Sequence, residues 1–69
     1  MTVKSIIDKI RKGKLKPGVY TTTNEKKENA IIVCLNDNHI LVTTAQKNGW
    51  IRMNEYDENG NMIGEIYER

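Results

Sequence analysis

Cysteine, histidine, proline and tryptophan each occur once in this sequence, and phenylalanine does not occur. A single cysteine excludes a disulfide within the chain, although small secreted domains usually depend on such cross-links. One cysteine and one histidine also fall short of the four ligands that a structural zinc site needs. We therefore expect no metal and no cofactor, and a protein that works in a reducing compartment.

Long apolar runs are absent as well. The longest, residues 30–35, is far shorter than the roughly 20 residues that a membrane-spanning helix needs. Residues 1–9 place Lys4, Asp8 and Lys9 where a secretory signal would be apolar, and no small-residue cleavage site follows. The sequence therefore predicts a cytoplasmic protein that does not associate with a membrane.

The length of 69 residues allows one domain, residues 1–69, with a small core. A deep catalytic cleft would compete with that core for the same apolar side chains. The five glycines also form no phosphate-binding loop. We therefore expect that the protein is not an enzyme.

Charge is distributed unevenly, although the net charge is only +2. Residues 1–16 hold six lysines and arginines and one carboxylate. Residues 17–69 hold five lysines and arginines and eight carboxylates. The densest cations are Arg11, Lys12, Lys14 and Lys16. Such a segment either contacts phosphates or complements the negative end of a helix dipole.

The N-terminal segment has the pattern of an amphipathic helix over about residues 3–12. Four apolar residues recur at i, i+3, i+4 and i+7: Val3, Ile6, Ile7 and Ile10. Thr2 is suited to cap the start of this helix and Gly13 to end it.

From residue 18 onward, β-branched and aromatic residues alternate with Asn-, Asp- and Gly-rich turns. The pattern predicts antiparallel strands at about residues 19–23, 30–35, 39–45, 50–56 and 62–67. The expected fold class is therefore α+β, with one N-terminal helix packed on a four- to five-stranded antiparallel meander that spans about residues 19–67.

The strands leave open which of their faces meets the helix. One set of strand residues or its opposite-parity neighbours can join the helix in the core. That set is Val19, Ile31, Val33, Ile40 and Val42. One short helix covers only one face of the sheet, so apolar side chains remain on the other. We therefore expect a homodimer or a partner interface on that face or along an edge strand.

A catalytic pair would have to be assembled from Cys34, His39 and a carboxylate such as Asp37. Simple pairing across the turn at residues 36–38 places Cys34 opposite Leu41 and not opposite His39. We therefore predict no catalytic residue. A structural role is expected for both Cys34 and His39.

Trp50, Arg52 and Tyr56 fall at i, i+2 and i+6 of one predicted strand, so their side chains point to one face. Tyr67 joins that face, opposite Arg52, if the turn at Asn59-Gly60 has two residues. An exposed face of this composition stacks bases or anchors a protein, whereas a buried one belongs to the core.

The same two-residue turn would place Tyr56 opposite Ile63. A three-residue turn with a bulge at Gly60 would instead shift the register by one residue. Tyr67 would then leave the face that holds Arg52.

The C-terminal hairpin resembles that of one known family. Ile51-Arg52, followed at the same spacing by Asp57-Glu58-Asn59-Gly60 and Met62, is similar to the I-R…D-E-N-G-E-M hairpin of the transcriptional-coactivator type single-strand DNA-binding proteins. The resemblance covers about a dozen residues and implies binding of single-stranded DNA. Ile63-Gly64-Glu65-Ile66 stands here in place of the lysine- and glycine-rich run of that family.

The chain as a whole is also similar in style to small phage and mobile-element proteins of low-GC bacteria, including anti-CRISPR proteins. We therefore expect a non-enzymatic protein that binds and blocks a host nucleic-acid-processing or defence protein, such as a nuclease, in the cytoplasm of a bacterial host. The alternative is a module that binds single-stranded nucleic acid. The candidate binding residues are Trp50, Arg52, Tyr56, Tyr67, Arg11, Lys12, Lys14 and Lys16.

Overall fold

The computed structural model describes residues 2–35 and 37–69, so Met1 and Asn36, which belongs to the predicted turn at residues 36–38, lie outside the described residues. The chain begins with one helix, α1 (Val3–Arg11), one residue shorter than expected. Thr2 caps it, because its Oγ1 accepts the N–H of Ser5 while its own N–H donates to Ser5 Oγ. Gly13 follows with a φ of +73°, a conformation that favours glycine and ends the helix.

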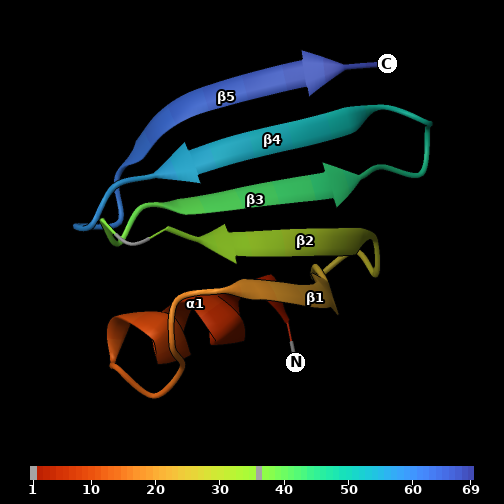
Figure 1. Ribbon diagram of the computed structural model, residues 1–69. Helices are drawn as coiled ribbons and strands as arrows, with labels where there is room; N and C mark the ends of the chain where they lie inside the picture. The colour runs from red at the N-terminus through yellow and green to blue at the C-terminus, as the bar shows by residue number, and fades with distance from the viewer. Residues whose placement is uncertain (1, 36) are drawn as a thin grey trace.

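Five strands follow α1 and form one antiparallel sheet in the order β1-β2-β3-β4-β5 (Figure 1). Their bounds are β1 (Val19–Thr23), β2 (Asn29–Cys34), β3 (Ile40–Ala45), β4 (Ile51–Tyr56) and β5 (Met62–Glu68). Each strand pairs with its neighbours in the sequence, so every connection is a hairpin. The predicted α+β meander is confirmed, with five strands.

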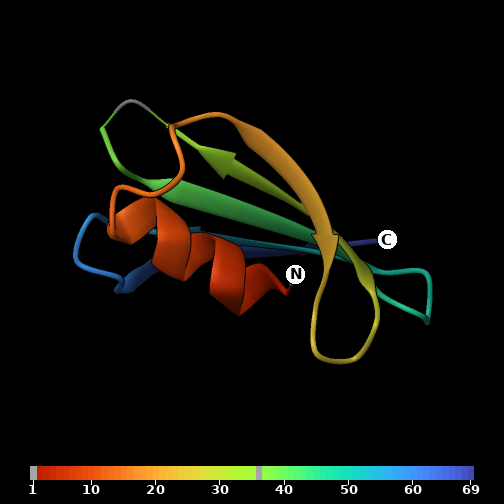
Figure 2. The ribbon, with the colours of Figure 1, turned by 90° about the horizontal axis from the view of Figure 1, so that it is seen from below.

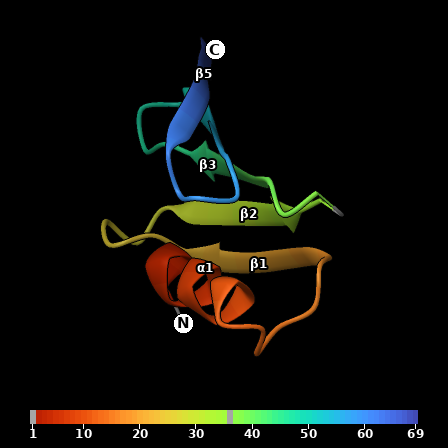
Figure 3. The same cartoon turned by 90° about the vertical axis from the view of Figure 1, so that its left-hand side faces the viewer.

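The core lies between α1 and one face of the sheet (Figures 2 and 3). The buried apolar residues of this layer are Ile6, Ile32, Cys34, Ile40 and Val42. On β2 the parity that holds Ile32 and Cys34 faces the helix, and Ile31 and Val33 face the other way. The core thus takes Ile40 and Val42 from the set named in the sequence analysis, but on β2 it takes the opposite-parity neighbours.

The turn between β2 and β3 shifts the pairing register of these two strands by one residue from the expected one. Leu35 N–H donates to His39 C=O at 2.8 Å, and Asn38 has a φ of +66°. Cys34 therefore lies opposite Ile40, not opposite Leu41. The prediction assumed a simple hairpin, whereas the left-handed conformation at Asn38 adds one residue to the turn.

Candidate functional site

The hairpin of β4 and β5 places Arg52 opposite Tyr67, as the sequence predicted for a two-residue turn. The turn itself has three residues, because Asp57 N–H donates to Asn61 C=O at 2.9 Å and Gly60 takes a φ of +89°. Such a turn alone would have moved Tyr67 to the other face. A second register shift in the same hairpin compensates for it.

Ile63 is the residue at which this compensation occurs. Tyr56 pairs with Met62 and Glu55 pairs with Gly64, so Ile63 is left without a partner on β4. The prediction that Tyr56 lies opposite Ile63 was therefore wrong. Two one-residue irregularities cancel, and the parity of β5 beyond Gly64 is the one that a two-residue turn would have given.

Trp50, Arg52 and Tyr67 lie together and form what we call the aromatic–arginine strip. The rings of Trp50 and Tyr67 meet edge to face, with centroids 6.2 Å apart and planes at 70°. Arg52 Cζ lies 5.5 Å from the Tyr67 ring centroid, and Arg69 Cζ lies 5.9 Å from that of Trp50. These distances allow cation–π attraction, so the two rings lie side by side between two guanidinium groups.

Glu65 and Asn54 hold Arg52 in place. Glu65 Oε2 accepts from Arg52 Nη2 at 2.8 Å and from Arg52 Nε at 3.1 Å, and it also accepts from Asn54 Nδ2 at 2.8 Å. The hydrogen bonds from Arg52 and then Asn54 lower the pKa of Glu65, and the bond to Glu65 raises the pKa of Arg52. The guanidinium is therefore oriented before any partner arrives.

Sequence reasoning did not connect Asn54 or Glu65 with Arg52. Their signal lies in the register, because Glu65 is directly opposite Asn54 and diagonal to Arg52. Gln46 was also missed. Gln46 lies in the turn before β4, and its Nε2 donates to the Tyr67 hydroxyl at 3.3 Å.

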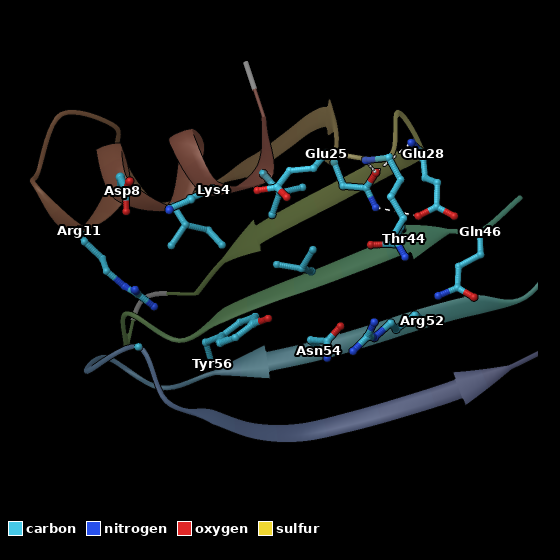
Figure 4. Close-up of a pocket in the computed structure, with 16 residues that line it drawn as sticks. Lys4, Asp8, Arg11, Glu25, Glu28, Thr44, Gln46, Arg52, Asn54 and Tyr56 are labelled. Carbon is cyan, nitrogen blue, oxygen red and sulfur yellow. Dashed lines mark hydrogen bonds between the residues drawn. The ribbon is translucent and has the colours of Figure 1, made fainter.

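A groove of about 520 Å³ separates α1 from β4 on the helix side of the sheet. Figure 4 shows Lys4, Asp8 and Arg11 along the helix, and Arg52 and Tyr56 along the opposite wall. The other polar residues that line it are Asn24, Glu25, Lys26, Glu28, Thr44, Gln46 and Asn54. The groove therefore carries charges of both signs.

Tyr56 and Arg11 lie at the end of the groove nearest the β4–β5 turn. The Tyr56 ring is half-buried and packs against the core, so it is not part of the aromatic–arginine strip. The Arg11 guanidinium covers Gly60, where an added Cβ would lie 2.7 Å from Arg11 Nη1. Three of the predicted site residues, Arg11, Arg52 and Tyr56, thus line the groove.

Lys12, Lys14 and Lys16 are exposed in the connection between α1 and β1. This connection begins beside the β4–β5 turn, because Arg11 contacts Gly60 there. Trp50 and Tyr67 lie at the opposite ends of β4 and β5 (Figure 1). The structure thus does not gather the basic segment and the aromatic–arginine strip into one site.

Cys34 and His39 lie on opposite faces of the sheet. The Cys34 thiol is buried in the core under α1, and that burial raises its pKa, which makes the thiolate scarce at neutral pH. The His39 side chain contacts Glu55 of β4, whose partner Leu41 is on the face away from the helix. These two residues therefore do not form a nucleophile–base pair.

Carboxylates engage both ring nitrogens of His39. Nδ1 lies 3.1 Å from Glu55 Oε2, and Nε2 lies 3.2 Å from Glu58 Oε2. The hydrogen bond with Glu55 is the main cause that raises the His39 pKa, and desolvation opposes it. This arrangement stabilises an imidazolium that bridges β4 and the following turn.

Within residues 2–35 and 37–69, no cluster of three or more His, Cys, Asp and Glu side chains is arranged to hold a metal ion. In the same part of the chain, no helix is long and apolar enough to cross a membrane. No protein-family model, curated protein or solved structure matches the chain. The likeness to single-strand DNA-binding proteins therefore rests on the hairpin of residues 51–62 alone.

Proposed function

We propose that this protein is a small non-enzymatic interaction protein that binds a partner protein through its helix-side surface. The aromatic–arginine strip anchors the partner, and the groove beside α1 accommodates a neighbouring part of it. The observation that carries this proposal is the fixed Arg52 guanidinium, which Glu65 and Asn54 orient beside the exposed ring of Tyr67. Tryptophan, tyrosine and arginine are the residues that most often dominate binding energy in protein interfaces.

The distribution of charge favours a protein partner over nucleic acid. Glu65 already compensates the positive charge of Arg52. The groove mixes Lys4 and Arg11 with Asp8, Glu25 and Glu28, whereas a phosphate-binding groove is lined mainly by cations. A polar surface with both signs of charge is typical of the rim of a protein–protein interface.

We propose that the chain is a phage or mobile-element protein that uses this surface to inhibit a nucleic-acid-processing or defence protein of a bacterial host. The inhibition is stoichiometric. The support is the pairing of a compact 69-residue chain with a preorganised binding strip. The two residue types best suited to covalent chemistry, Cys34 and His39, lie on opposite faces. Occupation of a partner's surface is the action that this layout supports.

Binding of single-stranded nucleic acid is the second candidate. The observation in its favour is the exposed Tyr67 ring beside Trp50 and Arg69, since bases stack on such rings. The salt dependence of binding distinguishes the two candidate functions. Phosphate contacts release counterions, so nucleic-acid binding weakens steeply as salt rises, whereas an aromatic anchor in a protein interface is much less affected.

The test is capture of partners from bacterial lysate, with and without nuclease treatment and at low and high salt, by the full chain and by two variants. Arg52→Ala removes the anchor, and His39→Ala removes an ion pair on the opposite face. We expect one protein to be retained by the wild type and by His39→Ala at high salt, and to be lost with Arg52→Ala. Circular dichroism and thermal unfolding must show that both variants fold.

Two results would contradict the proposal. Binding that disappears with nuclease or with high salt supports the nucleic-acid alternative. A folded Arg52→Ala variant with full binding, together with a folded but inactive His39→Ala variant, would overturn the interaction surface and direct attention to chemistry at His39.

A further inference from the structure

The sheet face away from α1, which we call the open face, carries apolar side chains on all five strands, with threonines among them. One row of paired residues crosses it from β1 to β5: Thr21, Ile31, Thr43, Met53 and Ile66. The adjacent row contains Val19, Val33 and Leu41. Alpha helices in the described part of the chain are limited to α1, which lies on the other side (Figure 2).

Large apolar side chains on the open face are exposed. Ile31 on β2 retains 46% of its surface accessible to solvent, and Ile66 on β5 retains 53%. Beside Ile31, a shallow hollow of about 420 Å³ is lined mostly by Thr, Ala and Ile side chains of β1 to β4. A contiguous apolar patch of this kind is rare on a monomer, because most such patches are covered by a partner.

The paired residues of the open face carry charge at two places, Glu55 and Glu68. Glu55 shares its row with Leu41 and is held by His39, and Glu68 lies opposite Ile51. The row from Thr21 to Ile66, which lies between them, is uncharged. An uncharged row of this kind is complementary to a second copy of itself, as a two-fold symmetric interface requires.

The size of the molecule permits a dimer. The Cα atoms span 34 × 24 × 16 Å, so the rectangle that encloses the two longer dimensions is about 800 Å². A protein–protein interface of standard size buries about 800 Å² on each partner. Two copies that stack through their open faces would therefore have to use nearly the whole face.

The small core favours a second copy over any other occupant. Among residues 2–35 and 37–69, six apolar residues are buried: Ile6, Ala30, Ile32, Cys34, Ile40 and Val42. A domain of this length usually needs a disulfide, a metal or oligomerisation for added stability. A second copy of the same chain is present wherever the protein folds, and it would add an apolar layer on the other side of the sheet.

From the parity, exposure, charge and size of the open face we infer that two copies of this chain associate through it. Their sheets stack face to face and leave both helix-side surfaces outward. This homodimer is independent of the proposed partner binding, because the aromatic–arginine strip lies on the opposite face of β4 and β5.

Sedimentation velocity between about 1 and about 500 µM tests the inference with the unmodified chain. We expect about 16 kDa at high concentration, twice the 8.0 kDa of one chain, with a thermal midpoint that rises with concentration. A species of 8.0 kDa at all concentrations, with a constant midpoint, would overturn the inference.

Two lysine substitutions on β5 locate the interface. Ile66 and Met62 are 53% and 54% exposed, but Ile66 lies on the open face, whereas Met62 Sδ accepts from Asn54 on the helix side. Ile66→Lys should weaken dimerisation by at least about tenfold, because it buries a charge. Met62→Lys should leave the dimer intact.

Comparison of Ile66→Lys with Met62→Lys also shows whether two copies meet through the open face or along the edge of β5. A dimer that both variants weaken equally would place the contact along that edge and overturn the proposed face. If Ile66→Lys fails to fold, Ile31→Lys on the same row replaces it, and the concentration dependence of the wild-type thermal midpoint still decides whether a dimer exists. A monomer that binds neutral lipid vesicles would also contradict the proposal.

Discussion

The two faces of the sheet are made by the same strands, yet they differ where the helix cover ends. On the helix side, β2 and β3 are apolar beneath α1, but β4 and β5 beyond it present Arg52, Asn54 and Glu65. On the open face, Met53 and Ile66 extend to β4 and β5 the row that contains Ile31, with Thr43 between Ile31 and Met53. Apolar side chains thus stay exposed on the side that has no helix, and the proposed dimer interface is based on this difference.

Adjacent residues on β2 test this difference most strongly. Ile32→Ala should lower the free energy of unfolding by about 2–5 kcal/mol, because Ile32 is fully buried and the substitution leaves a cavity. Ile31→Ala should cost less than about 1 kcal/mol at low protein concentration, and more only where two copies associate. Urea denaturation at two protein concentrations measures both. Equal losses at Ile31 and Ile32, unchanged by concentration, would contradict the assignment of the faces.

Trp50→Ala tests the helix side. A desolvated tryptophan anchor contributes about 2 kcal/mol or more, so we expect at least about a thirtyfold loss of partner affinity. Cys34→Ala is the control, since its thiol is buried away from the strip and its loss should affect stability only. Titration calorimetry with the captured partner measures the affinity of both variants. Wild-type affinity in a folded Trp50→Ala variant would remove Trp50 from the site.

Two glycines with the same backbone conformation test whether Arg11 closes the groove end. Gly49 and Gly60 both have a φ of +89°, but only at Gly60 does a neighbour, Arg11, lie where a Cβ would be placed. Each alanine substitution should cost about 1–2 kcal/mol for the left-handed backbone. Gly60→Ala should cost only slightly more, because the atoms that the new Cβ meets are the exposed end of the flexible Arg11 side chain. Combining Gly60→Ala with Arg11→Ala should remove that small excess. Thermal unfolding of both single glycine variants, of Arg11→Ala and of the double variant measures it.

The ion pairs of His39 predict a pH dependence at the rim of the open face. Folding raises the His39 pKa through Glu55, so the contribution to stability is complete below the ordinary pKa of about 6.5 and is lost as pH rises through the higher folded value. The stability difference between wild type and His39→Gln should therefore shrink from pH 6 toward higher pH. An NMR titration that places the His39 pKa at or below about 6.5 would contradict this account.

The sequence was sufficient for the element order, because the apolar spacing in α1 and the turn residues between strands are local signals. It was insufficient for register. The added residue at the β2–β3 turn moved Cys34 opposite Ile40, and Ile63 restored a parity that the three-residue β4–β5 turn had changed. Each irregularity is a single residue without a distinctive sequence, yet each decides which face a side chain joins.

The candidate site was predictable to a similar extent. Period-two alternation placed Trp50 and Arg52 on one face, and the register brought Tyr67 to them. Glu65 accepts hydrogen bonds from Arg52, 13 residues before it, and from Asn54, 11 residues before it. These cross-strand contacts can be predicted only once the register is known. The distance of Lys12, Lys14 and Lys16 from the strip likewise depends on where the helix ends over the sheet.

A dilution series of amide and methyl NMR spectra tests the division of the two faces most directly. The account predicts that the resonances that change with protein concentration belong to open-face residues such as Ile31, Leu41 and Ile66, while those of Arg52 and Tyr67 stay constant. Changes confined to Arg52, Tyr67 and their neighbours, with Ile31 and Ile66 unaffected, would show that copies meet through the helix side and would contradict the central claim.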